Sequence, residues 1–474
     1  MYRLCLVTDR EILDNKDLYK TIEGAVENGV TMVQLREKNI SIDSFVEIGK
    51  KLKKITDRLS VPLIINDNVE VARLIDASGV HLGQSDMSIE KSRKILGDNK
   101  IIGLSVSNLE EAKNSVKEKI DYIGVGPIYA TGSKKDAATP MGLAMLKKIK
   151  DDYNIPVIAI GGINSLNVEE VIDNGADGVA IISGILAAEN PSKKSKEIFD
   201  KINKRIFLNK ITKNLENIKS KTPLVYHLTN TVAINDCANI TLAMGGSPLM
   251  SFCLEEMEEI ISFASSVIIN IGTMEKEMVS MAVEVAKIAN RQLKPLILDP
   301  VGVGATNARK ELIEEILEKS YVDVIKGNLS EIKTILYEVS NSRGVDALDK
   351  ADINTKDIIL NGAKKLGCIL AVTGEIDYIS DGNKLIEIYN GNKVMEKVSG
   401  AGCMINSLIG SSIGANGITL ESVSLGVLAM SVCGEIACRG NENKGSGTLK
   451  SRIFDEIVSL NGDILKKEEK IKIY

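Results

Sequence analysis

The sequence has no tryptophan, only six phenylalanines and only two histidines among 474 residues. So few large aromatic rings argue against a protein that stacks on nucleic-acid bases. The net charge of -5 also lacks the excess of Lys and Arg that a duplex-binding face requires. So few histidines argue against acid–base catalysis by imidazole. We therefore expect small-molecule substrates and no nucleic-acid partner.

Signals for export, metal–thiolate sites and membrane spans are also scarce. Seven cysteines form an odd set without CxxC spacing, so we expect neither disulfides nor zinc. The N-terminal MYRLCLVTDREILDNK lacks a long apolar run, which predicts a cytoplasmic protein without a signal or transit peptide. Residues 404–436 are the most apolar region, but Asn406, Asn416 and Glu421 interrupt them. Their many Gly, Ser and Ala favour closely packed buried helices over a membrane span.

The first 185 residues contain eight short apolar runs, most of them separated by stretches with helical spacing. The runs are RLCLV, TMVQL, PLIIN, GVHLG, IIGLS, YIGVG, PVIAI and GVAII. Uniformly apolar strands that alternate with helices indicate a parallel sheet buried on both faces, and eight of them suffice to close a (β/α)8 TIM barrel. A doubly wound open sheet is the alternative.

A second domain is expected after a change in amino-acid composition. Residues 191–222 are Lys-rich, helical in period and nearly free of Gly, which predicts the last barrel helix running into the next domain. We place the domains at residues 1–206 and 207–474. Beyond the boundary, SSVIINIGT, KPLILDPVGVGA, VDVIKGN and CILAVTGEIDYIS predict parallel strands of another α/β domain.

Polar residues follow several of the predicted barrel strands, at the ends where barrel enzymes hold their active sites. QLREK places two cations and an amide on one side of an extended segment, and later strand ends add two carboxylates. Such a set suits Mg²⁺ bridging a polyphosphate. Hydroxyls, a lysine and glycines after later strands predict a second phosphate site.

The ordered strings QLREK, INDN, GVHLGQSD, GPIYATGSKK and AIGGI resemble thiamine phosphate synthase over residues 1 to about 206. That family joins hydroxymethylpyrimidine pyrophosphate to a thiazole phosphate and releases pyrophosphate. The resemblance implies that the pyrimidine pyrophosphate is held by Gln34, Arg36, Lys38, Asn66, Ser105 and Lys134, with Arg36 and Lys134 catalytic. It implies Mg²⁺ at Asp67 and Asp86, and the thiazole phosphate at Thr131, Gly132, Ser133, Gly162, Ile182 and Ser183. Ser133 departs from the Thr that the family often has, but it keeps the hydroxyl.

The coupling chemistry fits the scarcity of histidine. A thiazole nitrogen attacks with its own lone pair, so catalysis can rest on neutralising the leaving pyrophosphate. His81, in GVHLG, is therefore expected to have a structural or ligand-shaping role. The same argument disfavours a thiazole tautomerase, which is a related barrel that needs a proton shuttle.

In the second domain, the glycine-rich turn SGAGC precedes the apolar helix MINSLIGSSIG and could hold an anion on its backbone N–H groups. Packing alone explains such a turn about as well. Predicted strand ends upstream add Asp299, Lys326, Glu331 and Thr373, which supply acids for Mg²⁺ and donors for a triphosphate.

This pattern resembles the ribokinase-like kinases, whose turn usually ends in an aspartate where Cys403 stands here. With PLVYHLTNTVAINDCANITLAMGGSPLMS, NIGT, LDPVGVGAT and KGSGT, it resembles hydroxyethylthiazole kinase over about residues 213–460. The resemblance implies the thiazole alcohol at Met250 and Gly400, ATP at Lys326 and Thr373, Mg²⁺ at Asp299 and Glu331, and Cys403 beside the reacting hydroxyl. The family more often has Arg where Lys326 stands here. The lysine keeps the charge but lacks the two parallel donors of a guanidinium.

The thiol of Cys403 is expected to have a lowered pKa, because it lies at a helix N-terminus. We interpret it as a weak base or a group that positions the hydroxyl, with packing against the thiazole as the alternative. The other six cysteines are expected to be small core residues.

Together the two resemblances imply a bifunctional enzyme with ATP as co-substrate and Mg²⁺ at both sites. The kinase resemblance also implies a homo-oligomer, specifically a trimer through the second domain. Two alternatives remain open: a barrel that only binds ligands as a regulator, and a kinase for another small alcohol.

Overall fold

The computed structural model describes residues 2–132, 139–339, 354–441 and 444–474. They form two compact units, which meet in the sequence between Ile206 and Phe207.

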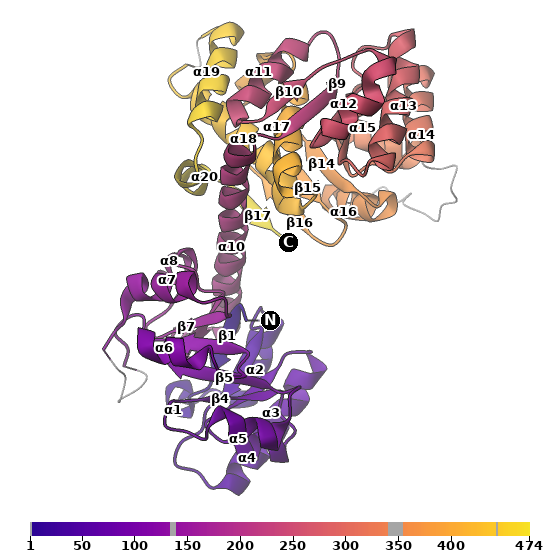
Figure 1. The fold of residues 1–474 in the computed structure, drawn as a ribbon. Coiled ribbons are helices and arrows are strands. Elements are labelled where there is room, and N and C mark those ends of the chain that lie inside the picture. Colours follow the sequence, from indigo (N-terminus) through magenta and orange to yellow (C-terminus); the bar gives the residue numbers. More distant parts are fainter. Residues whose placement is uncertain (1, 133–138, 340–353, 442–443) are drawn as a thin grey trace. The chain divides into compact units, whose positions relative to one another are not determined.

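The first unit is a closed barrel of parallel strands with helices outside it (Figure 1). This confirms the predicted (β/α)8 barrel, because β1 pairs with both β2 and β8 and no open edge is left among the described strands. The strands are β1 (Leu4–Val7), β2 (Met32–Leu35), β3 (Leu63–Asn66), β4 (Gly79–Leu82), β5 (Ile101–Val106), β6 (Tyr122–Val125), β7 (Val157–Ile160) and β8 (Gly178–Ile181).

The period of two along each strand separates the inside of the barrel from its outside. On β1, Leu4 and Leu6 pack outward against the helices, whereas Cys5 and Val7 join an inner cluster with Tyr122. These inner side chains fill the barrel below the cavity, so ligands enter from the C-terminal ends of the strands.

Helices cover the outer faces of the strands. In α3, a serine N-cap (Ser41) accepts the N–H of Ser44, and Phe45, Gly49, Leu52 and Thr56 form a buried stripe at helical spacing. The helices are α1 (Arg10–Leu13), α2 (Leu18–Glu27), α3 (Ile42–Arg58), α4 (Val69–Leu74), α5 (Ile89–Leu96), α6 (Leu109–Ser115), α7 (Gly142–Asp152), α8 (Val168–Asp173), α9 (Ser183–Leu186) and α10 (Pro191–Lys221). Helix α10 is continuous over 31 residues, and the boundary between the units lies within it.

The second unit is built on one sheet in the order β10-β9-β11-β12-β13-β14-β15-β16-β17. Its strands are β9 (Leu224–Leu228), β10 (Ser247–Leu249), β11 (Ser266–Asn270), β12 (Leu296–Asp299), β13 (Val324–Asn328), β14 (Ile369–Thr373), β15 (Asp377–Ser380), β16 (Leu385–Ile388) and β17 (Ile471–Ile473). The pairs from β10 to β14 are parallel, and those from β14 to β17 are antiparallel.

The antiparallel edge corrects one prediction, because CILAVTGEIDYIS does not contain parallel strands alone. Only residues 374–376 separate β14 from β15. A parallel connection needs a dozen residues or more, so this short turn can join only antiparallel neighbours.

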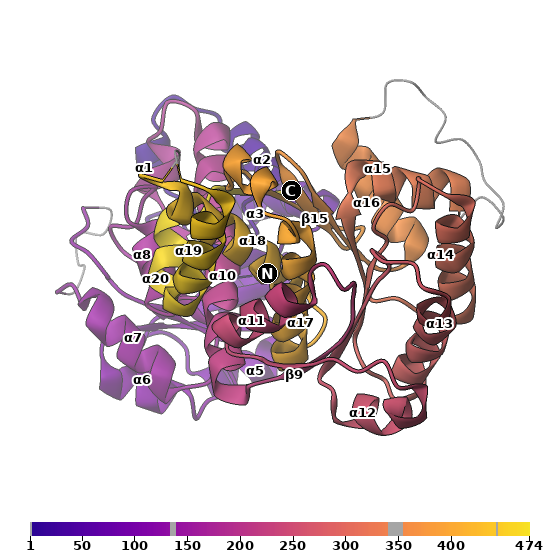
Figure 2. The ribbon, with the colours of Figure 1, turned by 90° about the horizontal axis from the view of Figure 1, so that it is seen from above.

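Helices cover both faces of this sheet (Figure 2). Val225 of β9 belongs to a buried cluster with residues of α11, α17, α18 and α19, and its neighbour Tyr226 belongs to another with residues of α12, α13, α14 and α16. The helices are α11 (Ile234–Met244), α12 (Met257–Phe263), α13 (Lys276–Arg291), α14 (Asn307–Lys319), α15 (Leu329–Thr334), α16 (Thr355–Leu366), α17 (Ala401–Asn416), α18 (Leu420–Cys438), α19 (Ser446–Ser459) and α20 (Gly462–Glu468).

The apolar region predicted to form closely packed helices does so, as α17 and α18. Helix α18 is long and apolar enough to cross a membrane, but 83% of its apolar window is buried within the fold. Gly426 allows close packing, because a Cβ there would lie 2.5 Å from the backbone nitrogen of Ile409 on α17. Burial against its own unit accounts for the composition of this helix.

Candidate functional sites

A cavity of about 660 Å³ opens at the C-terminal ends of the barrel strands. Nine of the predicted ligand residues line it: Gln34, Arg36, Asn66, Ser105, Thr131, Gly132, Gly162, Ile182 and Ser183. Its floor is formed by Cys5, Met32, Tyr122, Ile158 and Ala180. The volume lies within the range of small-molecule sites, roughly 300–1,000 Å³.

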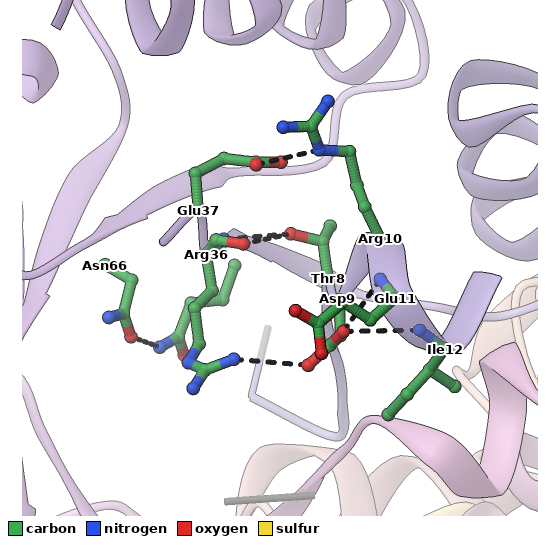
Figure 3. Close-up of polar contacts among 9 residues, drawn as sticks. Thr8, Asp9, Arg10, Glu11, Ile12, Arg36, Glu37 and Asn66 are labelled. Atoms are coloured by element: carbon green, nitrogen blue, oxygen red, sulfur yellow. Dashed lines mark hydrogen bonds and ion pairs between the residues drawn. The ribbon is translucent and has the colours of Figure 1, made fainter. Parts of the chain in front are cut away.

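Hydrogen bonds from its side chain and its backbone hold Arg36 in place at this cavity (Figure 3). Its guanidinium donates to Oδ2 of Asp9 at 3.3 Å, and its backbone N–H donates to the Thr8 hydroxyl at 2.9 Å. Asp9 is itself fixed, because its Oδ1 caps α1 by accepting the N–H groups of Glu11 and Ile12. Only one guanidinium nitrogen meets Asp9, so the others can donate to a ligand.

Two amides form the adjacent wall, where Nε2 of Gln34 donates to Oδ1 of Asn66 at 2.6 Å. Lys38 follows the same strand, but it is exposed and lies outside the cavity lining. QLREK therefore brings two of its three predicted ligand side chains to the cavity.

The two predicted metal carboxylates lie at the rim and are exposed. Asp67 follows β3 and Asp86 follows β4, and these strands are parallel neighbours, so both residues belong to one sector of the rim. Oδ2 of Asp86 accepts the Gly83 N–H at 2.7 Å, which leaves its Oδ1 for another ligand.

The opposite wall is formed largely by backbone. Gly162 has φ +66°, and a Cβ there would lie 2.7 Å from the carbonyl oxygen of Ala130, so glycine allows the two loops to meet. Thr131 and Ser183 also line this wall. Ser133 and Lys134 lie outside the described residues.

In the second unit, the predicted residues lie at or near the C-terminal ends of parallel strands. Met250 follows β10, Asp299 ends β12, Lys326 lies in β13 and Thr373 ends β14. Gly400, with φ +80°, precedes α17 as its N-cap residue, and no side chain caps this helix. The N–H of Ala401 donates to the carbonyl oxygen of Val398 at 3.2 Å, so an anion at this end would bind the N–H groups that follow it in the first turn.

Cys403 lies in the first turn of α17, where its sulfur accepts hydrogen bonds from the amides of Asn230 and Asn270, both at 3.3 Å. Burial raises the pKa of the Cys403 thiol, and the Asp299 carboxylate adds to the shift while Lys326 opposes it. The expected lowering is wrong in direction, because burial disfavours the thiolate more than the nearby ammonium favours it.

Asp299 and Lys326 form an ion pair in the core, with Nζ 2.9 Å from Oδ2 and side chains 1% and 5% exposed. The same Oδ2 accepts the amides of Asn270 at 2.7 Å and Asn406 at 2.5 Å. Burial raises the pKa of Asp299 against the opposing effect of Lys326. A Cβ on Gly402 would lie 3.6 Å from Nζ of Lys326, so this ammonium lies close to the glycine-rich turn.

Two further predicted residues have local roles. Glu331 closes a capping box on α15, and its two oxygens accept the N–H groups of Gly302 and Asn328. Thr373 is followed by a turn in which the Gly374 N–H donates to Oδ1 of Asp377. Burial raises the pKa of Asp377 to about 6.

The comparisons with known proteins divide the chain in the same way. Residues 4–185 match the model of thiamine monophosphate synthase, and residues 215–463 match that of the hydroxyethylthiazole kinase family. A probable thiamine biosynthetic bifunctional enzyme of Schizosaccharomyces pombe is 34% identical over 500 residues, which cover 98% of this chain and 96% of the relative. The chain belongs to this bifunctional family.

Each half also resembles proteins that consist of that half alone. A thiamine-phosphate synthase of Clostridium acetobutylicum is 50% identical over 203 residues, 43% of this chain and 96% of that protein. The solved structure of a hydroxyethylthiazole kinase from Pyrococcus horikoshii is 33% identical with a TM-score of 0.51, covering 56% of this chain and 99% of that one. The bifunctional chain therefore carries two recognisable enzymes in sequence.

Several residues at these sites were not singled out from the sequence. Asn230 and Asn270 lie within HLTNT and NIGT, strings that carried the kinase resemblance without an assigned role. Asp9 carried no signal beyond following an apolar run. Cys253 corrects the expectation that the other six cysteines lie in the core, because it is exposed while the remaining five are buried.

Proposed function

We propose that this bifunctional enzyme of thiamine biosynthesis performs two consecutive steps. In the second unit, ATP phosphorylates the hydroxyl of hydroxyethylthiazole. In the barrel, the thiazole phosphate is coupled to hydroxymethylpyrimidine pyrophosphate with release of pyrophosphate. The observation that best supports this assignment is the barrel cavity, around which residues suited to a pyrophosphate and to a monophosphate lie on opposite walls.

In the barrel step, the thiazole nitrogen attacks the methylene carbon of the pyrimidine while the bond to the pyrophosphate oxygen breaks. Arg36 stabilises the charge that develops on the leaving group, and Asp9 holds its guanidinium in place. Gln34, Asn66 and Ser105 bind the pyrimidine pyrophosphate. Lys38 and Lys134 are proposed as further cations for the same ligand.

The thiazole phosphate is proposed to bind at the opposite wall, held by Thr131, Gly132, Ser133, Gly162, Ile182 and Ser183. The position of Gly162 in the cavity lining supports this assignment, since a backbone N–H in such a glycine-containing turn can donate to a phosphate.

Mg²⁺ at both sites is part of this proposal, and one observation in the second unit supports it. In the second unit, Oδ1 of Asp299 is buried without a hydrogen-bond partner among the described residues, and an oxygen of this kind suits a hard cation. Asp299 and Glu331 would hold the ion there, and Asp67 and Asp86 would hold it at the barrel rim. When bound, Mg²⁺ neutralises phosphate oxygens.

In the kinase step, the uncapped N-terminus of α17 and the ammonium of Lys326 receive the negative charge of the transferred phosphoryl group. ATP binds at Lys326 and Thr373, and the thiazole alcohol binds at Met250 and Gly400. Cys403 positions the hydroxyl, because its raised pKa makes the thiol a poor base near neutral pH.

We also propose a cytoplasmic homotrimer assembled through the second unit. Support comes from exposed apolar side chains around α11 and the edge strand β10: Val232, Leu242, Phe252 and Leu254. Light scattering that shows a monomer would overturn the trimer.

The function is tested by mass spectrometry on purified protein with hydroxyethylthiazole, ATP, Mg²⁺ and the pyrimidine pyrophosphate, each omitted in turn. Thiamine phosphate is expected only from the complete mixture, and thiazole phosphate should replace thiazole plus ATP. Thiazole phosphate that never couples would reduce the barrel to a binding module. A substrate panel that favours another alcohol would overturn the kinase assignment.

A further inference from the structure

His81 connects two hydroxyl groups at the wall of the barrel cavity. Its Nδ1 lies 2.9 Å from the phenolic oxygen of Tyr122, and its Nε2 lies 2.9 Å from Oγ of Ser105. All three side chains line the cavity. Hydrogen bonds therefore run from a buried phenol at the floor to a serine that is proposed to contact the pyrimidine pyrophosphate.

The sheet itself fixes this arrangement. Gly103 on β5 pairs with His81 on β4 and with Tyr122 on β6. A Cβ on Gly103 would lie 2.1 Å from Cζ of Tyr122, and a Cβ on Gly124 would lie 2.8 Å from Cε1 of His81. Two glycines thus leave the space that the two rings occupy, and the rings stack with centroids 5.5 Å apart.

The direction of the hydrogen bonds follows from the phenol. Burial raises the pKa of Tyr122 well above its usual value, so the phenol keeps its proton. Among the described residues, the hydrogen-bond partner of this hydroxyl is Nδ1 of His81. The phenol therefore donates to Nδ1, and a neutral imidazole then carries its own proton on Nε2.

The proton on Nε2 determines what Ser105 can do. Oγ of Ser105 accepts from Nε2, so the hydroxyl hydrogen of the serine is left for a ligand in the cavity. The other tautomer would take that hydrogen and turn a lone pair towards the ligand, which is unfavourable when the ligand is an anion.

We propose that Tyr122 and His81 are positioning residues that keep the Ser105 hydroxyl as a hydrogen-bond donor to the diphosphate of the bound pyrimidine. This proposal rests on the proposed function for the identity of the ligand. It assigns no proton transfer to His81.

The tautomer can be read directly by ¹⁵N NMR of histidine-labelled full-length protein, because the chain has only two histidines. His227→Gln assigns the signals. We expect His81 to carry its proton on Nε2, and Tyr122→Phe to weaken or reverse that preference. A proton on Nδ1 in the wild type, or a spectrum that Tyr122→Phe leaves unchanged, would overturn the proposal.

A double-mutant cycle tests whether the effect passes through Ser105. In the full chain, Tyr122→Phe is expected to lower kcat/KM for the pyrimidine pyrophosphate about tenfold, as expected for a weakened hydrogen bond to a charged group. In the Ser105→Ala background it should have no further effect. Additive losses would contradict the proposal.

Tyr2→Phe is the matched control, because the ring of Tyr2 lies against that of Tyr122, with centroids 5.3 Å apart, and it removes a neighbouring phenol. It should leave the tautomer and kcat/KM unchanged, and an effect equal to that of Tyr122→Phe would overturn the proposal. If the wild-type chain made no thiamine phosphate, the proposed function would fail, while the spectrum would still report the tautomer and its dependence on Tyr122.

Discussion

The two units place polar groups at parallel strand ends in different ways. In the barrel, inward-facing side chains surround a cavity of about 660 Å³, and Arg36 directs free donors into it. In the second unit, Asp299, Lys326 and three asparagines bind one another in the core. A closed sheet directs its strand ends towards one axis, whereas an open sheet arranges them along an edge where neighbours can pair.

The two histidines show the same contrast between a cavity in the barrel and a core in the second unit. His81 has hydrogen-bond partners on both ring nitrogens and lines the cavity. His227 is buried in the second unit, where burial lowers its pKa to about 3. One imidazole therefore lines the candidate ligand site, and the other is held neutral as part of a core.

The largest effect is expected from Lys326→Met, which leaves Asp299 buried without its cation. The loss should destabilise the second unit by about 3–5 kcal/mol, because an unpaired buried charge is costly. Thiazole phosphorylation should fall roughly 1,000-fold through loss of charge stabilisation, while coupling of supplied thiazole phosphate persists. Calorimetry and separate assays of the two steps measure both effects.

Lys450→Met is the control for this prediction. Its ammonium lies 3.0 Å from Asp236, but the lysine side chain is 38% exposed, so the loss should be below about 1 kcal/mol. Equal destabilisation by the two variants would show that burial does not distinguish the two ion pairs.

Removing both rim carboxylates, with Asp67→Asn and Asp86→Asn, should weaken Mg²⁺ binding in the barrel alone. We expect the Mg²⁺ concentration for half-maximal coupling to rise roughly 10- to 100-fold, since amides replace the anionic ligands. The Mg²⁺ dependence of the kinase step is the internal control. A parallel change at both sites, or none at the barrel, would contradict the assignment.

The buried imidazole of His227 predicts a pH-dependent stability of the second unit. Its pKa of about 3 lies below the unfolded value of about 6.5, so the unfolded chain binds more protons between these values and stability falls as pH falls. The contribution lost between pH 7 and pH 5 is about 2 kcal/mol.

His227→Gln should remove this loss, as measured by unfolding of the second unit across that range. Asp377 acts in the opposite direction, because its raised pKa of about 6 makes stability fall as pH rises from about 4 to 6. The difference between variant and wild type isolates His227. An unchanged difference from pH 7 to pH 5 would show that the imidazole is not held neutral.

The smallest effect is expected at Cys403. Because the sulfur accepts from Asn230 and Asn270, Cys403→Ser should keep most kinase activity, and Cys403→Ala should lose about five- to tenfold. Because burial raises the pKa of the Cys403 thiol, the pH profile of kcat should lack the ionisation of an ordinary exposed thiol. A rise in kcat between pH 7 and 9 that disappears in Cys403→Ala would identify the thiol as a base.

Much of this architecture could be predicted because its signals are local. The eight barrel strands are contiguous apolar runs, and predicted ligand residues lie at their ends, as Asn66 does in β3, or directly after them, as Arg36 does after β2. Local pattern could not give the pairing of β17 with β16, since these strands pair across more than 80 residues.

The supporting residues were harder to foresee. Tyr122 lies in an apolar run and looks like core, and only the register of three strands brings it to His81. The thiol pKa of Cys403 was also beyond prediction from the sequence. The helix N-terminus is visible in the sequence, but the thiol pKa depends on burial and on the charges of Asp299 and Lys326, which only the fold brings to Cys403.

The most direct test of two independent sites in one chain uses two inactive variants, Arg36→Ala in the barrel and Lys326→Met in the second unit. Given hydroxyethylthiazole, ATP, Mg²⁺ and the pyrimidine pyrophosphate, Arg36→Ala should accumulate thiazole phosphate and Lys326→Met should leave the thiazole unchanged. Mixing the two proteins should restore thiamine phosphate. A mixture that stays inactive, or an Arg36→Ala protein that cannot phosphorylate the thiazole, would contradict the account.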